Sequence, residues 1–341
     1  MSRVSVILVN WNGWRDTLEC LDSLLGLDYP DFDIAVCDNA SGDDSAARIR
    51  EWAASRQVTF AEYDRQAAEG GGDGYQEGGT GTCNERGTGA WRSQSPKVTL
   101  IHTGANLGFA GGNNVGLRYA LARGASFCWL LNNDTVVEPD ALSQLCARME
   151  ADPGIGMCGS TIRYYQDRDR VQALGGGYYC RWIGLPWHHG RFTRGGSAAG
   201  GRAEARMNYV EGASMLVSRR FLLEVGLLCE DYFLFFEEAD WAERARGRFT
   251  LGYAPGSVVY HKVGQSIGTS SNPAKKSTVC DFYNIRNRIL FARRHHPVTL
   301  PTVYLVLGAE LMLRFLCGKW DRGIMIARLM LSAGNCGAVK P

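Results

Sequence analysis

The sequence predicts an α/β protein with a mostly parallel, Rossmann-like sheet and helices on both faces. Two observations lead to this fold class. Short apolar runs alternate with amphipathic stretches through the first half of the chain, which is typical of strands joined by helices. The 341 residues, 45% of them hydrophobic, are also sufficient for a substantial core.

The first strand and the first helix follow directly from the N-terminus. Residues 4–9 form an apolar run that is too short for an export signal and suits a buried strand. Residues 17–25 carry leucines at helical spacing and are predicted to form a helix. After a second strand at 33–37, residues 43–55 are predicted to form a second helix with Ile49 and Trp52 facing inward. The remaining predicted elements are strands at 58–63, 98–102 and 127–131 and a helix at 113–122.

Composition narrows the class of protein further. The formal net charge of +2 gives no reason to expect nucleic acid as a partner. Eleven cysteines are scattered singly, as expected for reduced thiols in a cytosolic protein. A glycine-rich stretch at 69–95 has no apolar period and is predicted to be a flexible surface insertion. Residues 175–207 are rich in aromatic side chains and are expected to face an acceptor.

In a parallel sheet, ligands gather beyond the carboxyl ends of the strands, so residues that follow a strand are candidates for chemistry. Asp38 and Asn39 follow the predicted strand at 33–37. The carboxylate can accept the imide N–H of uracil or thymine, and the amide can reach a ribose. The same residues also suit a turn that leads into a helix cap, and the segment alone leaves both interpretations open.

A glycine-rich segment at 106–113 joins a predicted strand to a predicted helix. Glycines let the backbone approach a ligand closely, and a helix N-terminus favours an anionic group. Gly108, Gly111 and Asn113 are therefore candidate ligand contacts. Many strand-to-helix turns, however, need glycine for their geometry alone.

Asn132, Asn133 and Asp134 follow the apolar strand predicted at 127–131. A hard divalent cation takes oxygen ligands and keeps several waters, so one carboxylate together with diphosphate oxygens suffices to hold it. Mg²⁺ or Mn²⁺ at Asp134 would neutralise charge on a departing diphosphate. The alternative is a turn that carries Asp134 before the next helix.

Glu237 and Glu238 follow an apolar run at 233–236. Acids at a helix N-terminus often serve only the helix dipole, but a carboxylate near aromatic side chains can have its pKa raised and act as a general base. His261 closes a strand-like run at 258–260. Most single histidines are structural, whereas one at a strand end can complete a metal site.

Taken together and in this order, these motifs resemble family-2 glycosyltransferases, and most closely the bacterial rhamnosyltransferase-like branch. The resemblance runs from about Val4 to His261 and rests on residues 6–12, 37–41, 106–113, 132–134 and 236–240. It implies a GT-A fold over residues 1–265, with a nucleotide-sugar-binding half at 1–150 and an acceptor-binding half at 151–265. It also implies transfer of a sugar, with inversion, from a nucleotide-diphosphate donor to a saccharide or lipid-linked acceptor.

The resemblance assigns donor-binding roles to individual residues. Asn10 lies in the donor-binding first loop, and Asp38, with Asn39 beside it, matches the base-recognising aspartate. Gly108, Gly111 and Asn113 match the glycine-rich donor loop. The preferred donor is dTDP-rhamnose, while UDP-sugars stay open because Asp38 can accept from either pyrimidine.

The resemblance also assigns the metal and the base. Residues 132–134 take the place of the DxD metal motif, but Asn132 replaces its first aspartate, so the divalent metal would be held mainly by Asp134 and phosphate. His261 matches a metal-ligand histidine. Glu237 and Glu238 match the acidic pair, whose second member is the base.

The C-terminal residues 266–341 are predicted to form a helical extension. Its apolar stretch at 300–316 lies between basic residues, which suits a helix at an anionic bilayer surface. Pro301, Glu310 and Arg314 argue against a full span. We therefore expect a cytoplasmic enzyme of cell-surface polysaccharide synthesis in peripheral contact with the inner face of the cell membrane. An ordinary core helix or an oligomer contact is the alternative.

Two other classes of protein compete with a glycosyltransferase. A nucleotide-dependent dehydrogenase would share the α/β rhythm, but residues 10–13 do not form the G-x-G-x-x-G turn expected after its first strand. A catalytically inactive, nucleotide-sugar-binding partner subunit would fit the replacement at Asn132. Asp134, Glu238 and His261 argue against it.

Overall fold

The computed structural model describes residues 1–72, 97–195, 203–262 and 277–332. Its first half consists of β1 (Val4–Asn10), α1 (Trp14–Leu25), β2 (Phe32–Asp38), α2 (Ser45–Arg56), β3 (Phe60–Asp64), α3 (Arg65–Glu69), β4 (Val98–His102), α4 (Gly108–Ala122), β5 (Phe127–Asn132), β6 (Thr135–Val137) and α5 (Ala141–Ala151). The second half consists of β7 (Ile155–Tyr164), β8 (Asp167–Leu174), β9 (Gly176–Cys180), β10 (Leu185–His188), β11 (Tyr209–Val210), β12 (Ser214–Ser218), α7 (Arg219–Val225), η2 (Glu230–Tyr232), α8 (Glu237–Ala245), β13 (Thr250–His261), α9 (Thr278–His295), η3 (Pro297–Thr299), α10 (Leu300–Leu316) and α11 (Trp320–Leu331).

The strands form one sheet in the order β10-β9-β8-β7-β12-β5-β1-β2-β4-β3. The pairs β1–β2, β1–β5, β2–β4 and β3–β4 are parallel, whereas β12 runs antiparallel to both of its neighbours. Asn10 pairs in register with Asp38, and Val9 with Asn132, so the carboxyl ends of three strands meet at one edge. The predicted mostly parallel sheet is confirmed.

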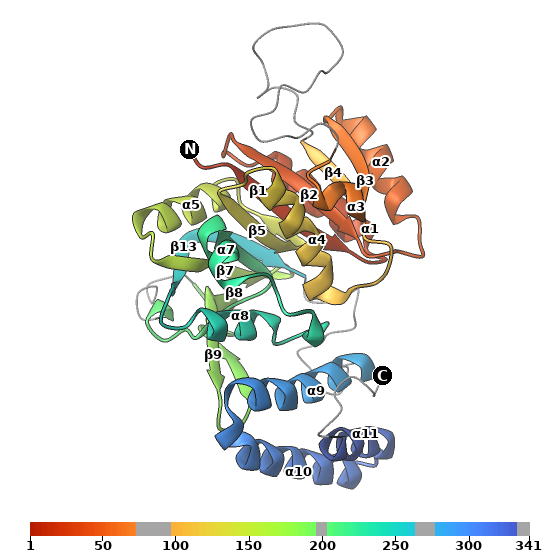
Figure 1. Ribbon diagram of the computed structural model, residues 1–341, viewed down its shortest axis with the longest axis vertical. Helices are drawn as coiled ribbons and strands as arrows, with labels where there is room; N and C mark the ends of the chain where they lie inside the picture. The colour runs from red at the N-terminus through yellow and green to blue at the C-terminus, as the bar shows by residue number, and fades with distance from the viewer. Residues whose placement is uncertain (73–96, 196–202, 263–276, 333–341) are drawn as a thin grey trace, which may run out of the picture.

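Helices cover both faces of this sheet (Figure 1). Successive side chains of a strand point to opposite faces, and β1 shows this directly. Val6 and Leu8 lie in a core with residues of α1, α2 and α5, whereas Ile7 lies in a core with residues of α4, α7 and α8.

The glycine-rich segment is helical from Gly108, so the predicted helix start at residue 113 was wrong. The reason is packing against the sheet. A Cβ atom at Gly112 would lie 2.8 Å from Val9 Cγ1, and one at Gly116 would lie 2.5 Å from Ile7 Cγ2. Glycine therefore lets α4 lie close to β1, although it disfavours a helix locally.

The other predicted elements agree with the structure to within a few residues at their ends. The predicted insertion at 69–95 lies almost entirely outside the described residues. The nine cysteines in the described ranges are free thiols.

Helices α9, α10 and α11 pack together at the end of the molecule that lies next to α8 and β9 (Figure 1). Their shared core contains residues such as Ile289, Val303 and Ile326. By length and composition, one helix among the described residues, Pro297–Leu316, would be able to cross a membrane. Only 17% of its most apolar window is buried in the structure.

Candidate active site

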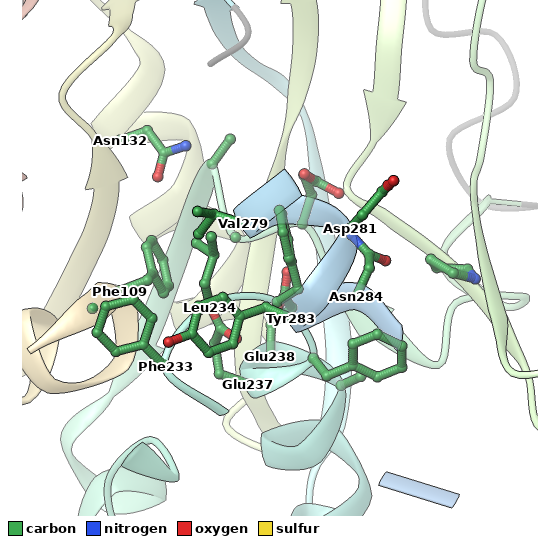
Figure 2. A pocket seen from close by; sticks show the side chains of 18 of the residues that line it. Phe109, Asn132, Phe233, Leu234, Glu237, Glu238, Val279, Asp281, Tyr283 and Asn284 are labelled. Atoms are coloured by element: carbon green, nitrogen blue, oxygen red, sulfur yellow. The ribbon is translucent and has the colours of Figure 1, made fainter. Parts of the chain in front are cut away.

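A cavity of about 1140 Å³ opens where β1 and β5 end. The starts of α4 and α8, the end of β13, and helices α9 and α10 complete its walls. Figure 2 shows Val279, Tyr283 and Asn284 of α9 in this pocket together with Glu237 and Glu238. Among the predicted site residues, the cavity is lined by Asn39, Gly108, Asn113, Asn132, Asn133, Asp134, Glu237, Glu238 and His261.

Asn10, Asp38 and Gly111 do not line the cavity. The buried carboxylate of Asp38 accepts hydrogen bonds from Asn10 Nδ2 (2.8 Å), from Ser41 Oγ (2.6 Å) and from the Ser41 N–H (3.1 Å). These contacts match the turn that the sequence left open as an alternative. Recognition of a base by Asp38 stays a prediction.

A chain of hydrogen bonds links these buried residues to the cavity wall. Asn133 Nδ2 donates to Thr17 Oγ1 (2.9 Å), and Thr17 in turn donates to Asn10 Oδ1 (2.8 Å). Asn39 Nδ2 donates to the carbonyl of Gly108 (2.8 Å), whereas Asn39 Oδ1 has no hydrogen-bond partner among the described residues. The strand ends are therefore fixed to one another, and Asn39 keeps a buried acceptor that no described residue satisfies.

The glycine-rich turn touches the segment that precedes the glutamate pair. Gly108 has a φ of +71°, and a Cβ atom there would lie 2.3 Å from the carbonyl oxygen of Phe233. The N–H of Phe109 donates to that oxygen (2.7 Å). A Cβ atom at Gly111 would lie 2.6 Å from Cβ of Leu107, so glycine avoids a clash there. Asn113 Nδ2 donates to the carbonyl of Phe109 (2.9 Å).

Asp134 and His261 form the part of the cavity that suits a cation. Nε2 of His261 lies 3.2 Å from Oδ1 of Asp134, and Nδ1 lies 3.1 Å from Oε1 of Gln172. Since an amide oxygen only accepts, Nδ1 carries the proton. In the neutral ring Nε2 therefore presents a lone pair to a carboxylate, an arrangement that a second proton or a cation would stabilise.

The electrostatics of His261 agree with this geometry. Burial opposes the charged ring, but the charge and the hydrogen bond of Asp134, together with the charge of Glu211, outweigh burial and raise the pKa of His261. Among the described residues, no three His, Cys, Asp or Glu side chains gather as a metal cluster. The donor set fits a divalent cation that takes its other ligands from a bound molecule and water.

Glu237 and Glu238 occupy the first turn of α8. One carboxylate oxygen of each is buried and has no hydrogen-bond partner among the described residues. Burial raises the pKa of both side chains. The neighbouring charges of Glu237 and Glu211 raise that of Glu238 further. Such a carboxylate is a strong proton acceptor once it is ionised.

Sequence reasoning missed several residues of this cavity. Gln172 and Glu211 reach it through β8 and β11, and Glu211 forms an ion pair with His188 (3.1 Å). Helix α9 contributes Tyr283, whose ring stacks on Phe233 with centroids 4.9 Å apart. For Glu211, a usable signal was the Glu-Gly-Ala segment at 211–213, which separates β11 from β12.

Comparison with known proteins agrees with the fold. The model of the family described as "Glycosyl transferase family 2" matches residues 5–78 and 88–207. No curated protein sequence matches the chain.

Many solved structures are similar to this chain, and two of them are described here. A mannosyltransferase from Pyrobaculum calidifontis, in complex with GDP-Man and Mn²⁺, has a TM-score of 0.55 and 16% identity over 100% of this chain and 88% of its own. GalNAc-T7, with UDP, GalNAc and Mn²⁺, has a TM-score of 0.55 and 13% identity, and the match covers 85% of this chain and 51% of that one. The predicted GT-A fold is therefore confirmed.

Proposed function

The chain belongs to glycosyltransferase family 2 and is a glycosyltransferase, and we propose that it moves a sugar from a nucleoside diphosphate to an acceptor hydroxyl with inversion. One observation carries this proposal. The Asp134–His261 pair and the Glu237–Glu238 pair line the same cavity. A charge-neutralising site and a proton acceptor are the two groups that a single displacement at an anomeric carbon requires.

Asp134 and His261 would hold a divalent metal, Mg²⁺ or Mn²⁺, with Gln172 fixing the imidazole ring. When bound, the metal neutralises the charge of the diphosphate leaving group. Both structures compared above contain Mn²⁺. Asn132, whose amide Nδ2 lies 3.4 Å from His261 Nε2, replaces the carboxylate of the family motif and adds no charge.

Glu238 acts as the general base in this proposal. Its carboxylate takes the proton of the acceptor hydroxyl as the acceptor oxygen forms a bond to the anomeric carbon. The bond between that carbon and the diphosphate oxygen breaks on the opposite face, and the nucleoside diphosphate leaves with the electron pair. Burial favours this role because it raises the basicity of the ionised carboxylate.

The preferred donor is dTDP-rhamnose, which follows from the resemblance to the rhamnosyltransferase-like branch. UDP-sugars are the second candidate, because a carboxylate at Asp38 can accept from either pyrimidine. The carboxylate oxygens of Asp38 are engaged with Asn10 and Ser41. Oδ2 accepts only the N–H of Ser41, so it keeps capacity for one more donor.

The proposed acceptor is a saccharide or a lipid-linked saccharide in cell-surface polysaccharide synthesis, reached at the inner face of the cell membrane. Exposed apolar side chains of α10, such as Leu305 and Leu316, support peripheral contact. The charged residues of α10 turn inward, since Glu310 pairs with Arg288 (2.8 Å) and Arg314 lies 3.4 Å from Asp281. A helix α10 that lies on the membrane surface keeps these ion pairs, and so we favour surface contact over a membrane-spanning helix.

A panel of nucleotide sugars tests the proposal. UDP-glucose, GDP-mannose and dTDP-rhamnose are each incubated with the protein, with and without MnCl₂, and release of nucleoside diphosphate is measured with water or added saccharides as acceptor. Metal-dependent release that Glu238→Gln loses supports the proposal. Binding of the nucleotides without any turnover would instead favour an inactive partner subunit.

A further inference from the structure

The turn before the glutamate pair has a backbone conformation that L-residues rarely adopt. The φ angle is +63° at Phe233, +70° at Phe235 and +77° at Phe236. Phe236 directly precedes Glu237, the first residue of α8, so this turn sets the direction of both glutamate side chains. Such a conformation persists only where surrounding groups hold it.

Asn287 of α9 supplies three of the contacts that hold this turn. Its side chain is fully buried, and Nδ2 donates to the carbonyl oxygens of Tyr232 (2.8 Å), Leu234 (2.8 Å) and Phe235 (3.0 Å). Since an amide nitrogen has two N–H groups, two of the three carbonyls share one of them. One side chain therefore fixes the backbone at three positions of the turn.

Other contacts of α9 act on the same segment. The ring of Tyr283 stacks on Phe233, and Figure 2 shows the two rings in the pocket. At the other end of α9, His295 Nε2 lies 2.7 Å from the buried Oδ1 of Asp240 in α8. Helix α9 therefore contacts both the turn and the helix that carries the glutamates.

We propose that α9 positions the glutamate pair for catalysis and that Asn287 is the positioning residue that fixes the turn. This inference rests on the proposed role of Glu238 as general base. Asn287 does not line the cavity, so it acts through the backbone rather than on a substrate. It also lies beyond residue 207, where the match to the family model ends.

The acidic limb of the pH–rate profile reports on this positioning. Glu238 is faced by Glu237, by Glu211, which pairs with His188, and by the phenol of Tyr209. Burial and the neighbouring carboxylates raise the pKa of Glu238. When the turn relaxes, the glutamates gain contact with water, and their pKa values fall toward the ordinary range.

The test compares Asn287→Ala and the isosteric Asn287→Asp with Asn114→Ala. Asn114 is a matched control, because it is also buried and makes three hydrogen bonds, to the N–H and carbonyl of Leu228 and to Glu230. Release of nucleoside diphosphate from the sugar panel is measured against pH. We expect both Asn287 variants to lose kcat on the order of 10²-fold with little change in donor KM. Their acidic limb should move to lower pH, whereas Asn114→Ala should lower only the melting temperature.

A folded Asn287→Ala protein with the kcat and acidic limb of the unmodified chain would overturn the inference, whatever its melting temperature. If both Asn287 variants fail to fold, Tyr283→Leu decides, since it removes the ring that stacks on Phe233 and leaves the hydrogen bonds of Asn287 in place. A displaced acidic limb in that variant supports the inference, and an unchanged limb overturns it. Failure of the proposed function is distinct, because Glu238→Gln would then keep normal turnover.

Discussion

Nε2 of His261 lies 3.2 Å from Oδ1 of Asp134 because β13 pairs with β6, with His261 in register with Thr135. The antiparallel pair joins two strand ends that are distant in the sequence. Gln172 then sets the tautomer of the ring from its other side. When the ring is neutral, the lone pair of Nε2 faces the carboxylate at the cavity wall, and a cation there would relieve the repulsion between them.

Removing this pair should abolish metal-dependent turnover. We expect Asp134→Ala and His261→Ala to lose several kcal/mol of transition-state stabilisation, on the order of 10³-fold in kcat. Gln172→Leu should lose about 10- to 100-fold in apparent Mn²⁺ affinity, because the ring is no longer held. Thermal shift with UDP and MnCl₂ measures binding, and His102→Ala, an exposed histidine paired with Glu62, is the control. Normal Mn²⁺ stabilisation of Asp134→Ala would contradict the assignment.

The two glutamates should differ in their effect on turnover. Glu238→Gln removes the proton acceptor without changing the shape of the side chain, and we expect kcat to fall about 10²- to 10⁴-fold. Glu237→Gln should have a smaller effect on kcat, because it removes only a neighbouring charge that raises the pKa of Glu238. Titration with UDP should show unchanged nucleotide binding in both. A larger loss in Glu237→Gln would reverse the two roles.

The buried acids also make stability depend on pH. Burial raises the pKa of Glu237 from its ordinary value of 4.5 to about 7, and that of Glu238 is raised too. The folded state therefore binds more protons than the unfolded state above pH 4.5, and stability falls as the pH rises through the raised pKa values. The protein loses about 1.4 kcal/mol of stability for each pKa unit by which the folded state raises the pKa of a carboxyl above its value in the unfolded state.

Glu238→Gln carries no titrating group at this position and should escape part of that loss. We expect the variant to melt at a higher temperature than the unmodified protein above neutral pH, although it is inactive. At acidic pH the two should melt alike, because the glutamate is then neutral. Melting curves at several pH values measure the difference. If the unmodified protein melted at a higher temperature than Glu238→Gln above neutral pH, the burial of an ionisable pair would be contradicted.

Local sequence patterns predicted the strands and the residues at their ends, because both depend on short-range periodicity. Asp134 and His261 fall into this class, since each lies at the end of a predicted strand. Gln172 and Asn287 were not predicted, since their positions depend on strand pairing and helix packing between distant segments. Asn287 did leave a signal, because it is a polar residue among the apolar positions Phe282, Ile285 and Ile289 of α9. Such a residue needs partners for its amide.

Gly108→Ala changes the glycine-rich turn, and we expect it to disturb the glutamate pair as well. The new Cβ atom would lie 2.3 Å from the carbonyl oxygen of Phe233, at a φ of +71°. Gly104→Ala is a matched control, since its φ is +80° and no atom lies within 4 Å of its Cβ position. Both variants should lose about 1–3 kcal/mol through backbone strain. Only Gly108→Ala should also lose turnover, and chemical denaturation together with nucleoside diphosphate release would separate the two effects.

The outer face of α10 should bind an anionic membrane surface. Leu305, Met312 and Leu316 are between 66% and 82% exposed, and their spacing places them on one side of the helix. Burial of a leucine side chain stabilises by roughly 1.5–3 kcal/mol, so Leu305→Glu with Leu316→Glu should weaken binding at least about 10²-fold. Leu223→Glu changes an equally exposed leucine on α7 and should have no effect.

Flotation with phosphatidylglycerol and with phosphatidylcholine vesicles measures this binding. A peripheral helix should bind the anionic vesicles, release at high salt and release in alkaline carbonate, because its attachment combines shallow apolar burial with charge. A spanning helix would resist both treatments. It would also have to separate Arg288 from Glu310 and Arg314 from Asp281, pairs that face the cavity. Retention in carbonate would therefore contradict surface binding, and equal flotation of the double variant would exclude this face of α10.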